Sequence, residues 1–510
     1  MEKSKVLPNI RIRKVILTDF RNIKYSEIDI PNGKMDDYLA ETPSILGLYG
    51  QNGSGKTSLL MAINALKTAL TGSEFLYPHF SSCIRSGASH ARLEFDFSAY
   101  NEKGVRYDIY YAFSLSVDEG DQLIDIQTKN EDDEIETALD EFLSTKYKSK
   151  ALNVLRPKDK RIIVSDEVLQ CGGESENGTK LNKQIIIDTS DKASSLSGKA
   201  FGNKTKYEQL TYNCSDEIHK NLNEWKAEAR VKSTSFLFSS NVVKNLIRGS
   251  RITSYKLILA ALTEYADNYL FVILTDETAY NSMKVLPFSM WVGGADGALG
   301  FYLPLTLADH CQIPEILYEI MPSVINVTSE VISKIVPGLR IEVSDIGKTV
   351  SDDGTEVHLF DLISNRNGVR IPLLYESDGI RRIISFLTLL IAVYNNPSVT
   401  VAIDEIDSGI FEYMLGEILS IMGESAKGQL IFTSHNLRPL EVLPPKFLLF
   451  TTVNPERRFA KLEGISGNNN LRDCYFRIIN LGVGKDAFYD ATDAFNIEQA
   501  LFEAGHAEEQ

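Results

Sequence analysis

A glycine-rich stretch near the start of the chain has the residue types and the spacing of a phosphate-binding loop. The segment GQNGSGKT, residues 50–57, fits the pattern G-x-x-x-x-G-K-[ST] and stands between a short apolar run and a segment with helical spacing of apolar residues. Glycines let such a loop curl until its backbone N–H groups point at phosphate oxygens, and the N-terminus of the following helix adds partial positive charge. By itself this phosphate loop therefore predicts a phosphate-binding site.

The residues of the phosphate loop have different predicted roles. Lys56 is expected to reach the β- and γ-phosphates and to take part in catalysis, and the Thr57 hydroxyl is expected to ligate Mg²⁺. The alternative is a chance glycine turn before a helix. The residues predicted to contact the nucleotide are Gly50, Asn52, Gly53, Ser54, Gly55, Lys56, Thr57 and Ser58.

Two acidic residues follow a second apolar run. The segment VTVAI, residues 399–403, reads as a buried strand, and Asp404 and Glu405 come directly after it. In parallel α/β sheets the ligand crevice opens at the carboxyl ends of the strands. An aspartate there can hold Mg²⁺, and a glutamate can orient or deprotonate the attacking water. We predict that Asp404 binds the metal and that Glu405 is the catalytic base, the alternative being an acidic pair in a surface turn.

A histidine ends the next apolar run. His435 closes QLIFTSH, residues 429–435, about 30 residues after Glu405. A histidine at this place can donate a hydrogen bond to the γ-phosphate, and we predict that it acts in catalysis. The alternative is a strand-end histidine with a structural role alone.

A serine and a glycine open an amphipathic segment just before the acidic pair. In ESDGIRRII, residues 376–384, Ser377 can cap a helix, and the N-terminus of that helix can bind an anion. We therefore add Ser377 and Gly379 to the residues that contact nucleotide.

The elements that must position these residues alternate between strands and helices. Apolar spacing predicts strands within 10–30 and at 44–49, 91–97, 106–117, 340–346, 357–364, 399–403 and 429–435, and helices at 58–70, 206–232, 253–268 and 313–335. Between 118 and 235 lie an acidic run, a basic run and a Ser/Gly/Lys-rich stretch, which indicate an inserted lobe. The glycine-rich stretch WVGGADGALG, residues 291–300, lacks a lysine and reads as a loop.

Bulk properties set further bounds on the class of protein. A chain of 510 residues should form two or three lobes, and its net charge of −16 argues against a surface that is positive throughout. Five cysteines lie far apart, which suits a reducing cytosol. No stretch reaches eighteen apolar residues, so we expect a cytoplasmic protein without a membrane span.

In this order the motifs resemble those of the ATP-binding heads of the ABC superfamily, in the branch of SMC, RecF and OLD-like ATPases. The phosphate loop resembles the Walker A motif of that family, 403–405 its Walker B motif, 376–382 its signature motif and His435 its switch histidine. The resemblance implies an α/β fold with a mixed sheet flanked by helices, an antiparallel β subdomain and here a large, mainly helical insertion. The implied divisions are a first part of the head at 1–117, the inserted lobe at 118–335, a second part of the head at 336–450 and a C-terminal extension at 451–510.

The resemblance also implies a homodimer or a higher homo-oligomer with composite ATP sites. Ser377 and Gly379 of one copy would close over ATP and Mg²⁺ held at Lys56 of the other copy, and Arg381 or Arg382 would add positive charge there. Candidates for two further family loops are Asp407, for communication across the dimer, and 239–241, for the glutamine loop.

Single-head ATPases of this kind resemble the ATP-binding components of bacterial anti-phage operons, such as AriA, PtuA and AbiL-type proteins. That resemblance implies a sensor or regulatory ATPase that controls a separate effector, a nuclease or a toxin, because too few residues follow His435 for the nuclease domain of OLD-type proteins. The alternative is a RecF-like repair ATPase that binds DNA. Seven cations in 146–161 would then contribute to a phosphate-tracking surface, unless they form a solvated loop balanced by the acidic run.

Overall fold

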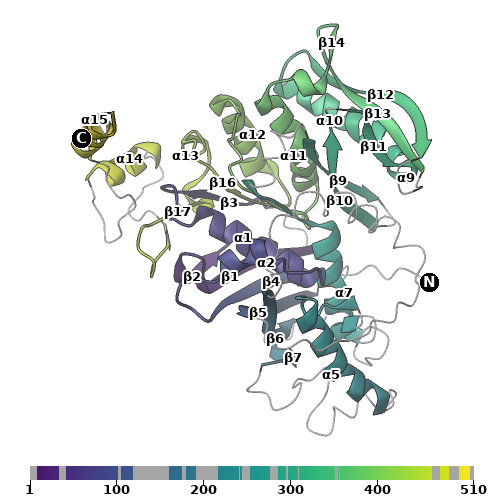
Figure 1. The fold of residues 1–510 in the computed structure, drawn as a ribbon, viewed down its shortest axis with the longest axis vertical. Coiled ribbons are helices and arrows are strands. Elements are labelled where there is room, and N and C mark those ends of the chain that lie inside the picture. The colour runs from purple at the N-terminus through teal and green to yellow at the C-terminus, as the bar shows by residue number, and fades with distance from the viewer. Residues whose placement is uncertain are drawn as a thin grey trace.

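The computed structural model describes most of the chain in fourteen stretches and one isolated residue. The described residues are 9–33, 42–101, 105–118, 160–174, 180–190, 216–240, 242–243, 253–275, 285–294, 297–307, 309–350, 354, 356–461, 471–481 and 493–505. Figure 1 shows two sheets stacked around helix α1, with further helices and a smaller sheet above them.

The central sheet is mixed and has six strands in the order β18-β17-β3-β16-β15-β8. Strands β17, β3, β16, β15 and β8 are parallel to their neighbours, and β18 is antiparallel to β17. Their bounds are β3 (Ser44–Tyr49), β8 (Leu270–Ile273), β15 (Thr400–Ile403), β16 (Gln429–Thr433), β17 (Leu448–Thr451) and β18 (Phe459–Ala460). The strands of the phosphate loop and of the acidic pair, β3 and β15, are separated by β16 alone, so their carboxyl ends lie at one edge.

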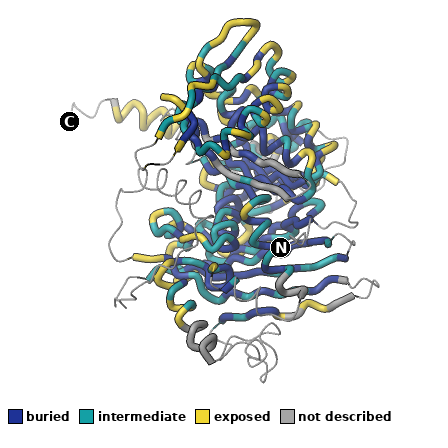
Figure 2. The backbone as a smooth tube through the Cα atoms, turned by 90° about the vertical axis from the view of Figure 1, so that its right-hand side faces the viewer, coloured by how far each residue is buried: buried dark blue, intermediate teal, exposed yellow. Residues whose placement is uncertain are grey.

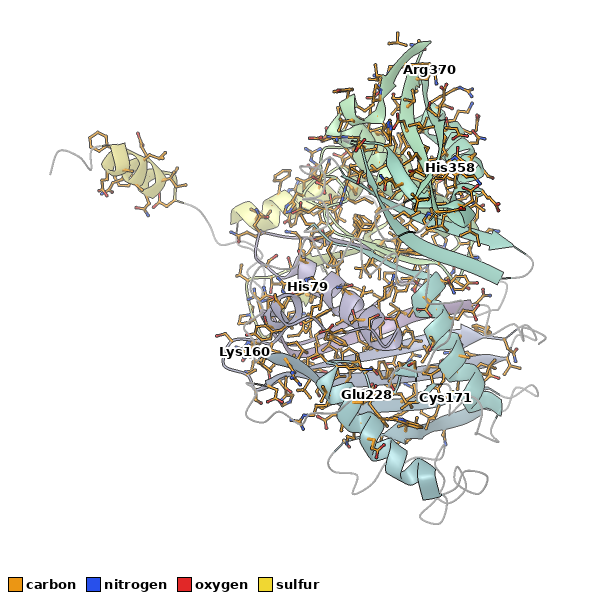
Figure 3. The ribbon with its side chains drawn as sticks, turned by 45° about the vertical axis from the view of Figure 1, so that its right-hand side comes forward. His79, Lys160, Cys171, Glu228, His358 and Arg370 are labelled. Atoms are coloured by element: carbon orange, nitrogen blue, oxygen red, sulfur yellow. The ribbon has the colours of Figure 1, made fainter. Side chains whose placement is uncertain are left out.

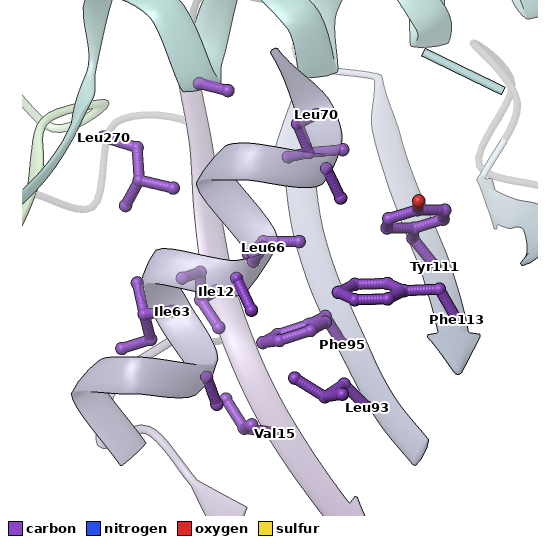
Figure 4. Packing of buried hydrophobic residues seen from close by; sticks show 14 of the residues in the cluster. Ile12, Val15, Ile63, Leu66, Leu70, Leu93, Phe95, Tyr111, Phe113 and Leu270 are labelled. Carbon is purple, nitrogen blue, oxygen red and sulfur yellow. The ribbon is translucent and has the colours of Figure 1, made fainter. Parts of the chain in front are cut away.

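The second sheet is antiparallel, with the order β2-β1-β4-β5-β6-β7. Its strands are β1 (Asn9–Phe20), β2 (Ile23–Asp29), β4 (His90–Tyr100), β5 (Arg106–Asp118), β6 (Arg161–Glu174) and β7 (Lys180–Asp188). Helix α1 (Lys56–Leu70) shares one buried cluster with residues from both sheets. In Figure 4 Ile63, Leu66 and Leu70 of α1 lie against the strands that carry Val15 and Phe95. A helix that is apolar on nearly all sides suits this place between two sheets.

A second buried cluster covers the other face of the central sheet. It joins Val401 and Ile403 of β15 to Ile383, Leu387 and other apolar residues of α11 (Asp378–Asn395). Helix α12 (Glu412–Ser425), the hairpin β9 (Val285–Gly294)–β10 (Gly297–Thr306) and α10 (Met321–Ile335) also contribute residues to it. Figure 2 shows dark blue, buried backbone running through the sheets and the helices above them.

The smaller sheet and the remaining elements complete the fold. The sheet has the order β11-β13-β12, with β14 paired to β13, and its strands are β11 (Cys311–Pro314), β12 (Leu339–Val350), β13 (Glu356–Arg366) and β14 (Val369–Pro372). The other helices are α2 (Tyr77–Phe80), η1 (Ser81–Cys83), α5 (Asp216–Val231), α7 (Thr253–Asn268), α9 (Glu315–Tyr318), η3 (Leu373–Tyr375), α13 (Pro439–Val442), η4 (Pro445–Phe447), α14 (Leu471–Leu481) and α15 (Ala494–Gly505).

Two buried polar side chains fasten the antiparallel sheet to the central sheet. The Gln429 amide donates to the carbonyl oxygen of Ile12 at 2.8 Å and accepts from the backbone N–H of Ile12 at 2.8 Å. The Arg11 guanidinium donates to the carbonyl oxygens of Asn32, Thr42, Pro397 and Lys427. Because burial penalises its charged form, the pKa of Arg11 falls to about 10. The two sheets are therefore joined by polar contacts as well as by α1.

The predicted α/β fold, with a mixed sheet flanked by helices and an antiparallel sheet, is confirmed. The described part of 118–335 contains helices, as expected, and it also supplies β6 and β7 to the antiparallel sheet and β8 to the central sheet. The expected loop at 291–300 falls mostly within the β9–β10 hairpin. The predicted boundary at 450/451 cuts β17, which pairs with β3. The acidic run and most of the basic run lie outside the described residues.

None of the helices in the described stretches is long and apolar enough to cross a membrane. Each of the four cysteines that the structure describes, Cys83, Cys171, Cys311 and Cys474, is free.

Candidate nucleotide-binding site

The phosphate loop connects β3 to α1 in a conformation that needs glycine. Gly50, Gly53 and Gly55 have φ values of 151°, 76° and 107°, a region that side-chain-bearing residues rarely adopt. A Cβ atom at Gly50 would also lie 1.9 Å from the Thr451 hydroxyl oxygen, so this position has no room for a side chain. The loop ends at Gly55, and α1 begins at Lys56 with its free N–H groups at the loop.

The ammonium group of Lys56 lies inside the curl of the phosphate loop. It donates to the carbonyl oxygen of Gly50 at 2.7 Å and to that of Gln51 at 3.1 Å, and the residue is only 6% exposed. Burial lowers the pKa of Lys56, whereas the nearby carboxylates of Asp404 and Glu405 favour its charged form. A buried cation held at the N-terminus of a helix is suited to a ligand with several negative charges.

The Asp404 carboxylate is buried and surrounded by hydroxyl groups. Its Oδ1 atom accepts from Thr433 at 2.6 Å and from Thr57 at 3.4 Å, and its Oδ2 atom accepts from Thr275 at 2.7 Å. Asp404 is 2% exposed. A carboxylate beside the threonine hydroxyl at the start of α1 provides hard oxygen ligands of the kind that Mg²⁺ prefers, so the residues present fit this ion.

The side chains of Glu405 and His435 lie close to one another in the site. Their Oε1 and Nε2 atoms are 3.8 Å apart, and the two side chains are 39% and 42% exposed. Glu405 has a φ of 47°, in the left-handed region, and its N–H donates to the Thr433 hydroxyl oxygen at 2.7 Å. A residue other than glycine persists in this strained conformation when its surroundings fix it, which is frequent at functional sites.

The phosphate loop, the acidic pair and His435 line one pocket of about 580 Å³. Among the residues predicted from the sequence, the pocket brings together Asn52, Gly53, Gly55, Lys56, Thr57, Ser58, Asp404, Glu405 and His435. Gly50 and Ser54 lie behind this surface, where Ser54 donates to the carbonyl oxygen of Gln51 at 2.6 Å. The pocket is lined as well by Arg21, Asn22, Ser82, Ile84, Ser86 and Thr433.

The turn between β1 and β2 forms a wall of the pocket that the sequence analysis missed. The amide of Asn22 donates to the carbonyl oxygen of Gly53 at 2.8 Å and accepts from the Ser58 hydroxyl at 3.2 Å. A Cβ atom at Gly55 would lie 3.1 Å from the Asn22 amide oxygen. Asn22 therefore holds the phosphate loop from outside. The sequence carries no local signal for this contact, since the partners come from separate elements.

The predicted signature residues, Ser377 and Gly379, lie away from the pocket lining. Ser377 caps α11 by accepting from the N–H of Ile380 at 3.4 Å, as expected, and the residue is exposed. Neither Ser377 nor Gly379 is among the described residues that line the pocket. Gly379 packs against Gly409, where an added Cβ atom would lie 2.0 Å from the carbonyl oxygen.

The two arginines of the signature segment face their own subunit. Arg382 is 2% exposed and donates to the carbonyl oxygen of Asp404 at 3.0 Å. Arg381 pairs with Asp378 on the same helix, and its side chain is 11% exposed. The idea that either arginine adds charge at the site of a second copy is thus at odds with their burial.

The two candidates for family loops, Asp407 and residues 239–241, lie in different parts of the subunit. The carboxylate of Asp407 accepts from the backbone N–H groups of His435 and Asn436, which places it next to the pocket in its own subunit. Residues 239–240 adjoin Phe238, whose carbonyl oxygen would lie 2.5 Å from a Cβ atom at Gly72. They therefore lie beyond the C-terminal end of α1, one helix length away from the phosphate loop, and the glutamine-loop assignment is wrong. Asn241 lies outside the described residues.

A glycine loop at the carboxyl end of a parallel strand, a lysine inside it and an acidic pair two strands away define a P-loop nucleotide-binding protein. A family model described as AAA ATPase domain matches residues 11–438. This chain therefore belongs to the AAA ATPase domain family.

Solved structures that are similar to this chain include SMC heads and the recombination mediator protein RecF. An Smc head bound to the C-terminal winged-helix domain of ScpA has a TM-score of 0.38 and 12% identity, covering 89% of this chain and 98% of that chain. The recombination mediator protein RecF-ATPrS in the RecFOR pathway has a TM-score of 0.35 and 10% identity, covering 89% of this chain and 98% of that chain. The SMC head domain from Thermotoga maritima has a TM-score of 0.33 and 12% identity, covering 89% of this chain and 99% of that chain. No curated protein matches the chain.

Proposed function

We propose that this chain hydrolyses ATP with Mg²⁺ as a homodimer or higher homo-oligomer, and that hydrolysis controls a separate effector protein in anti-phage defence. The observation that carries the enzymatic part is the meeting of Lys56, Asp404, Glu405 and His435 in one pocket from three different strand ends. The family supports an ATPase.

The residues of the pocket have distinct roles in this proposal. The N–H groups of the phosphate loop and the Lys56 ammonium bind the phosphates, and Thr57 and Asp404 hold Mg²⁺. When bound, the ion neutralises charge on the phosphate oxygens. Glu405 orients the attacking water and accepts its proton. His435, whose Nε2 atom lies 3.8 Å from the Oε1 atom of Glu405, donates a hydrogen bond to the terminal phosphate.

A second copy would complete the site. Ser377 is exposed at the start of α11 and does not line the pocket of its own subunit within the described residues. The first turn of this 18-residue helix presents backbone N–H groups, of which that of Ile380 is capped by Ser377, and such groups can bind an anion. Both observations support an arrangement in which this helix end faces the phosphates held by another subunit.

Mixing of two inactive variants tests the composite site. Lys56→Ala should lose tight ATP binding, and Ser377→Arg should block the helix end, so each variant alone should be inactive. After subunit exchange, mixed dimers keep one complete site. Random pairing at equal ratios makes about half of the dimers mixed, so we expect up to about a quarter of the wild-type activity. Exchange is verified with differently tagged subunits. If exchanged dimers are no more active than either parent, the site is not shared.

The defence role is tested in cells together with the genes beside this one. Phage plating should fall in cells with the wild-type chain and its neighbouring effector, and Glu405→Gln should abolish that protection. Salt-dependent binding of duplex DNA that needs ATP, without any effect on phage, would favour the RecF-like alternative, for which the cations of 146–161 are the candidate contacts.

A further inference from the structure

The hairpin of β17 and β18, residues 448–460, is attached to the phosphate loop at two places. Thr451 at the end of β17 contacts the loop itself, and Arg458 next to β18 contacts the turn that carries Asn22. We propose that this hairpin, here called the C-terminal brace, sets the affinity of the phosphate loop for ATP, with Thr451 and Arg458 as positioning residues, and that α14 is the element through which this affinity is regulated. The inference rests on the proposed function, because it concerns ATP bound at the same site.

The first attachment is a buried hydroxyl group at the phosphate loop. The Thr451 hydroxyl donates to the carbonyl oxygen of Tyr49 at 3.1 Å and is hydrogen-bonded to the Ser54 hydroxyl. Thr451 is 0% exposed. Tyr49 directly precedes the loop and Ser54 lies near its end, so one side chain of the brace ties the two ends of the curl together.

The backbone of the loop packs directly on the same threonine. A Cβ atom at Gly50 would lie 1.9 Å from the Thr451 hydroxyl oxygen and 3.1 Å from its Cβ atom. The carbonyl oxygen of Gly50 accepts from the Lys56 ammonium at 2.7 Å. A displacement of Thr451 therefore moves the backbone that holds the cation of the site.

The second attachment runs through the turn between β1 and β2. The Nε atom of Arg458 donates to the carbonyl oxygen of Asn22 at 3.1 Å. The Asn22 amide in turn donates to the carbonyl oxygen of Gly53 in the phosphate loop at 2.8 Å. The N–H of Lys24 donates to the carbonyl oxygen of Pro455 at 3.1 Å, so the turn and the brace are joined at a further point. Arg458 thus acts on the loop through Asn22.

Three aromatic rings connect the start of the phosphate loop to α14. The ring centroid of Tyr475 in α14 lies 5.1 Å from that of Phe450 in the brace, which lies 6.1 Å from that of Tyr49. Tyr49 and Phe450 are each 1% exposed. Because buried rings are closely packed, a shift of Tyr475 is felt by Phe450 and by the residue that directly precedes Gly50.

Helix α14 has a small contact with the rest of the subunit. Of the α14 side chains that the structure describes, Leu471 and Tyr475 are buried. Arg472 pairs with Glu441 of α13 at 2.8 Å, and these side chains are 37% and 20% exposed, so salt weakens this pair. An element held by so few buried groups is displaced at lower cost than the strands of the central sheet. A partner that binds α14 would therefore change the affinity for ATP.

Calorimetric titration of the full chain with Mg²⁺ and a non-hydrolysable ATP analogue tests the first attachment. Thr451→Val keeps the volume and removes the hydroxyl, so the dissociation constant should rise by about threefold to tenfold. Thr451→Ser restores the hydroxyl and should bind as the wild type does. Thr328→Val, in α10, is the matched control, because it removes another fully buried hydroxyl, one that donates to the carbonyl oxygen of Val324.

The second attachment is tested in the same titration. Arg458→Ala releases the Asn22 turn, so the dissociation constant should rise by about threefold or more. Arg457→Ala is the matched control, because this neighbouring arginine is exposed and should leave the affinity unchanged.

Steady-state kinetics separate positioning from a general loss of structure. Thr451→Val and Arg458→Ala should raise KM and leave kcat within about twofold, because a loosened phosphate loop binds the ground state and the transition state less well to the same extent. A loss of folded protein would instead lower the apparent kcat and leave KM unchanged.

Substitutions in α14 test the regulatory route. Tyr475→Ala removes the ring that packs on Phe450, so the dissociation constant for the analogue should rise by about threefold. Tyr475→Phe keeps the ring and should bind as the wild type does. Phe476→Ala is the matched control, since it removes a ring of the same helix that is 41% exposed.

Three results would overturn the inference: a wild-type dissociation constant in Thr451→Val, in Arg458→Ala or in Tyr475→Ala. A wild-type chain that binds the analogue and never hydrolyses ATP would instead refute the proposed function, and the dissociation constants would still decide whether the C-terminal brace positions the phosphate loop.

Discussion

The Thr433 hydroxyl donates to the Asp404 carboxylate at 2.6 Å, at the centre of the pocket. The same oxygen accepts from the N–H of Glu405 at 2.7 Å. One buried hydroxyl on β16 thus orients the proposed metal ligand and holds the proposed base in its left-handed conformation. Strand β16 lies between the strands of the phosphate loop and the acidic pair, and a short side chain at its carboxyl end reaches both acidic residues.

Replacement of Thr433 by valine should preserve volume and remove this hydroxyl. The N–H of Glu405 and one Asp404 oxygen would lose a partner, so the free energy of unfolding should fall by about 1–3 kcal/mol. We expect kcat to fall by about tenfold to 100-fold, because both acidic groups lose orientation. Thr433→Ser keeps the hydroxyl and serves as control. Steady-state ATPase assays that give equal kcat for the two variants would contradict this role.

Replacement of Glu405 by glutamine should separate binding from chemistry. The amide keeps the size of the side chain but cannot accept a proton, so kcat should fall by at least about 100-fold. ATP binding, measured by calorimetry, should persist, and light scattering with ATP should detect an accumulated dimer. Hydrolysis at the wild-type rate would exclude Glu405 as the base.

Replacement of Asn22 by alanine should weaken ATP binding without blocking catalysis. Its amide makes one hydrogen bond to Gly53 of the phosphate loop and one to Ser58 in the first turn of α1, so the dissociation constant for ATP should rise by about threefold to tenfold. Asn365→Ala, in β13, removes an amide that contacts Glu342 away from the pocket and is the control. Titration calorimetry would count against the contact if the two variants bound ATP equally well.

The stability of the smaller sheet should depend on pH through His358, which Figure 3 labels in that sheet. Its two ring nitrogens lie 2.8 Å from carboxylate oxygens of Glu315 and Asp345, and its ring stacks on Tyr318. Burial lowers the pKa of His358, but the hydrogen bonds that its ring donates to the two carboxylates outweigh burial, and the pKa lies above its usual 6.5.

A raised pKa means that the folded state favours the protonated ring. The stabilisation is therefore complete below about pH 6.5, the unfolded value, and is lost as the pH rises through the folded pKa. We expect the melting temperature of the wild type to exceed that of His358→Gln by more at pH 6 than at pH 9. Lys348, which pairs with Glu315, keeps its charge over this range. A pH-independent difference between the two proteins would refute the interpretation.

Residues that act through their own backbone or that end an apolar strand could be found from the sequence. The phosphate loop is specified locally, because its glycines and its lysine occupy eight consecutive positions and a segment with helical spacing follows directly. Asp404 and His435 each end an apolar run, and the rule that parallel strands open at their carboxyl ends was enough to place them near the loop. Their catalytic roles remain predictions that the variants above test.

Contacts between elements distant in the chain were decided by the tertiary structure alone. Asn22 meets Gly53, Arg382 meets Asp404 and Gly379 meets Gly409 only because two sheets pack on α1 and α11 packs on the central sheet. Nothing in the local sequence distinguished Arg382, which is buried, from an arginine facing a second subunit. Likewise, β8 reads as a short apolar run, and only its pairing with β15 shows that it belongs to the central sheet. These contacts depend on which surfaces of different elements are buried against each other, and the periodicity of apolar residues within one segment does not determine its partner.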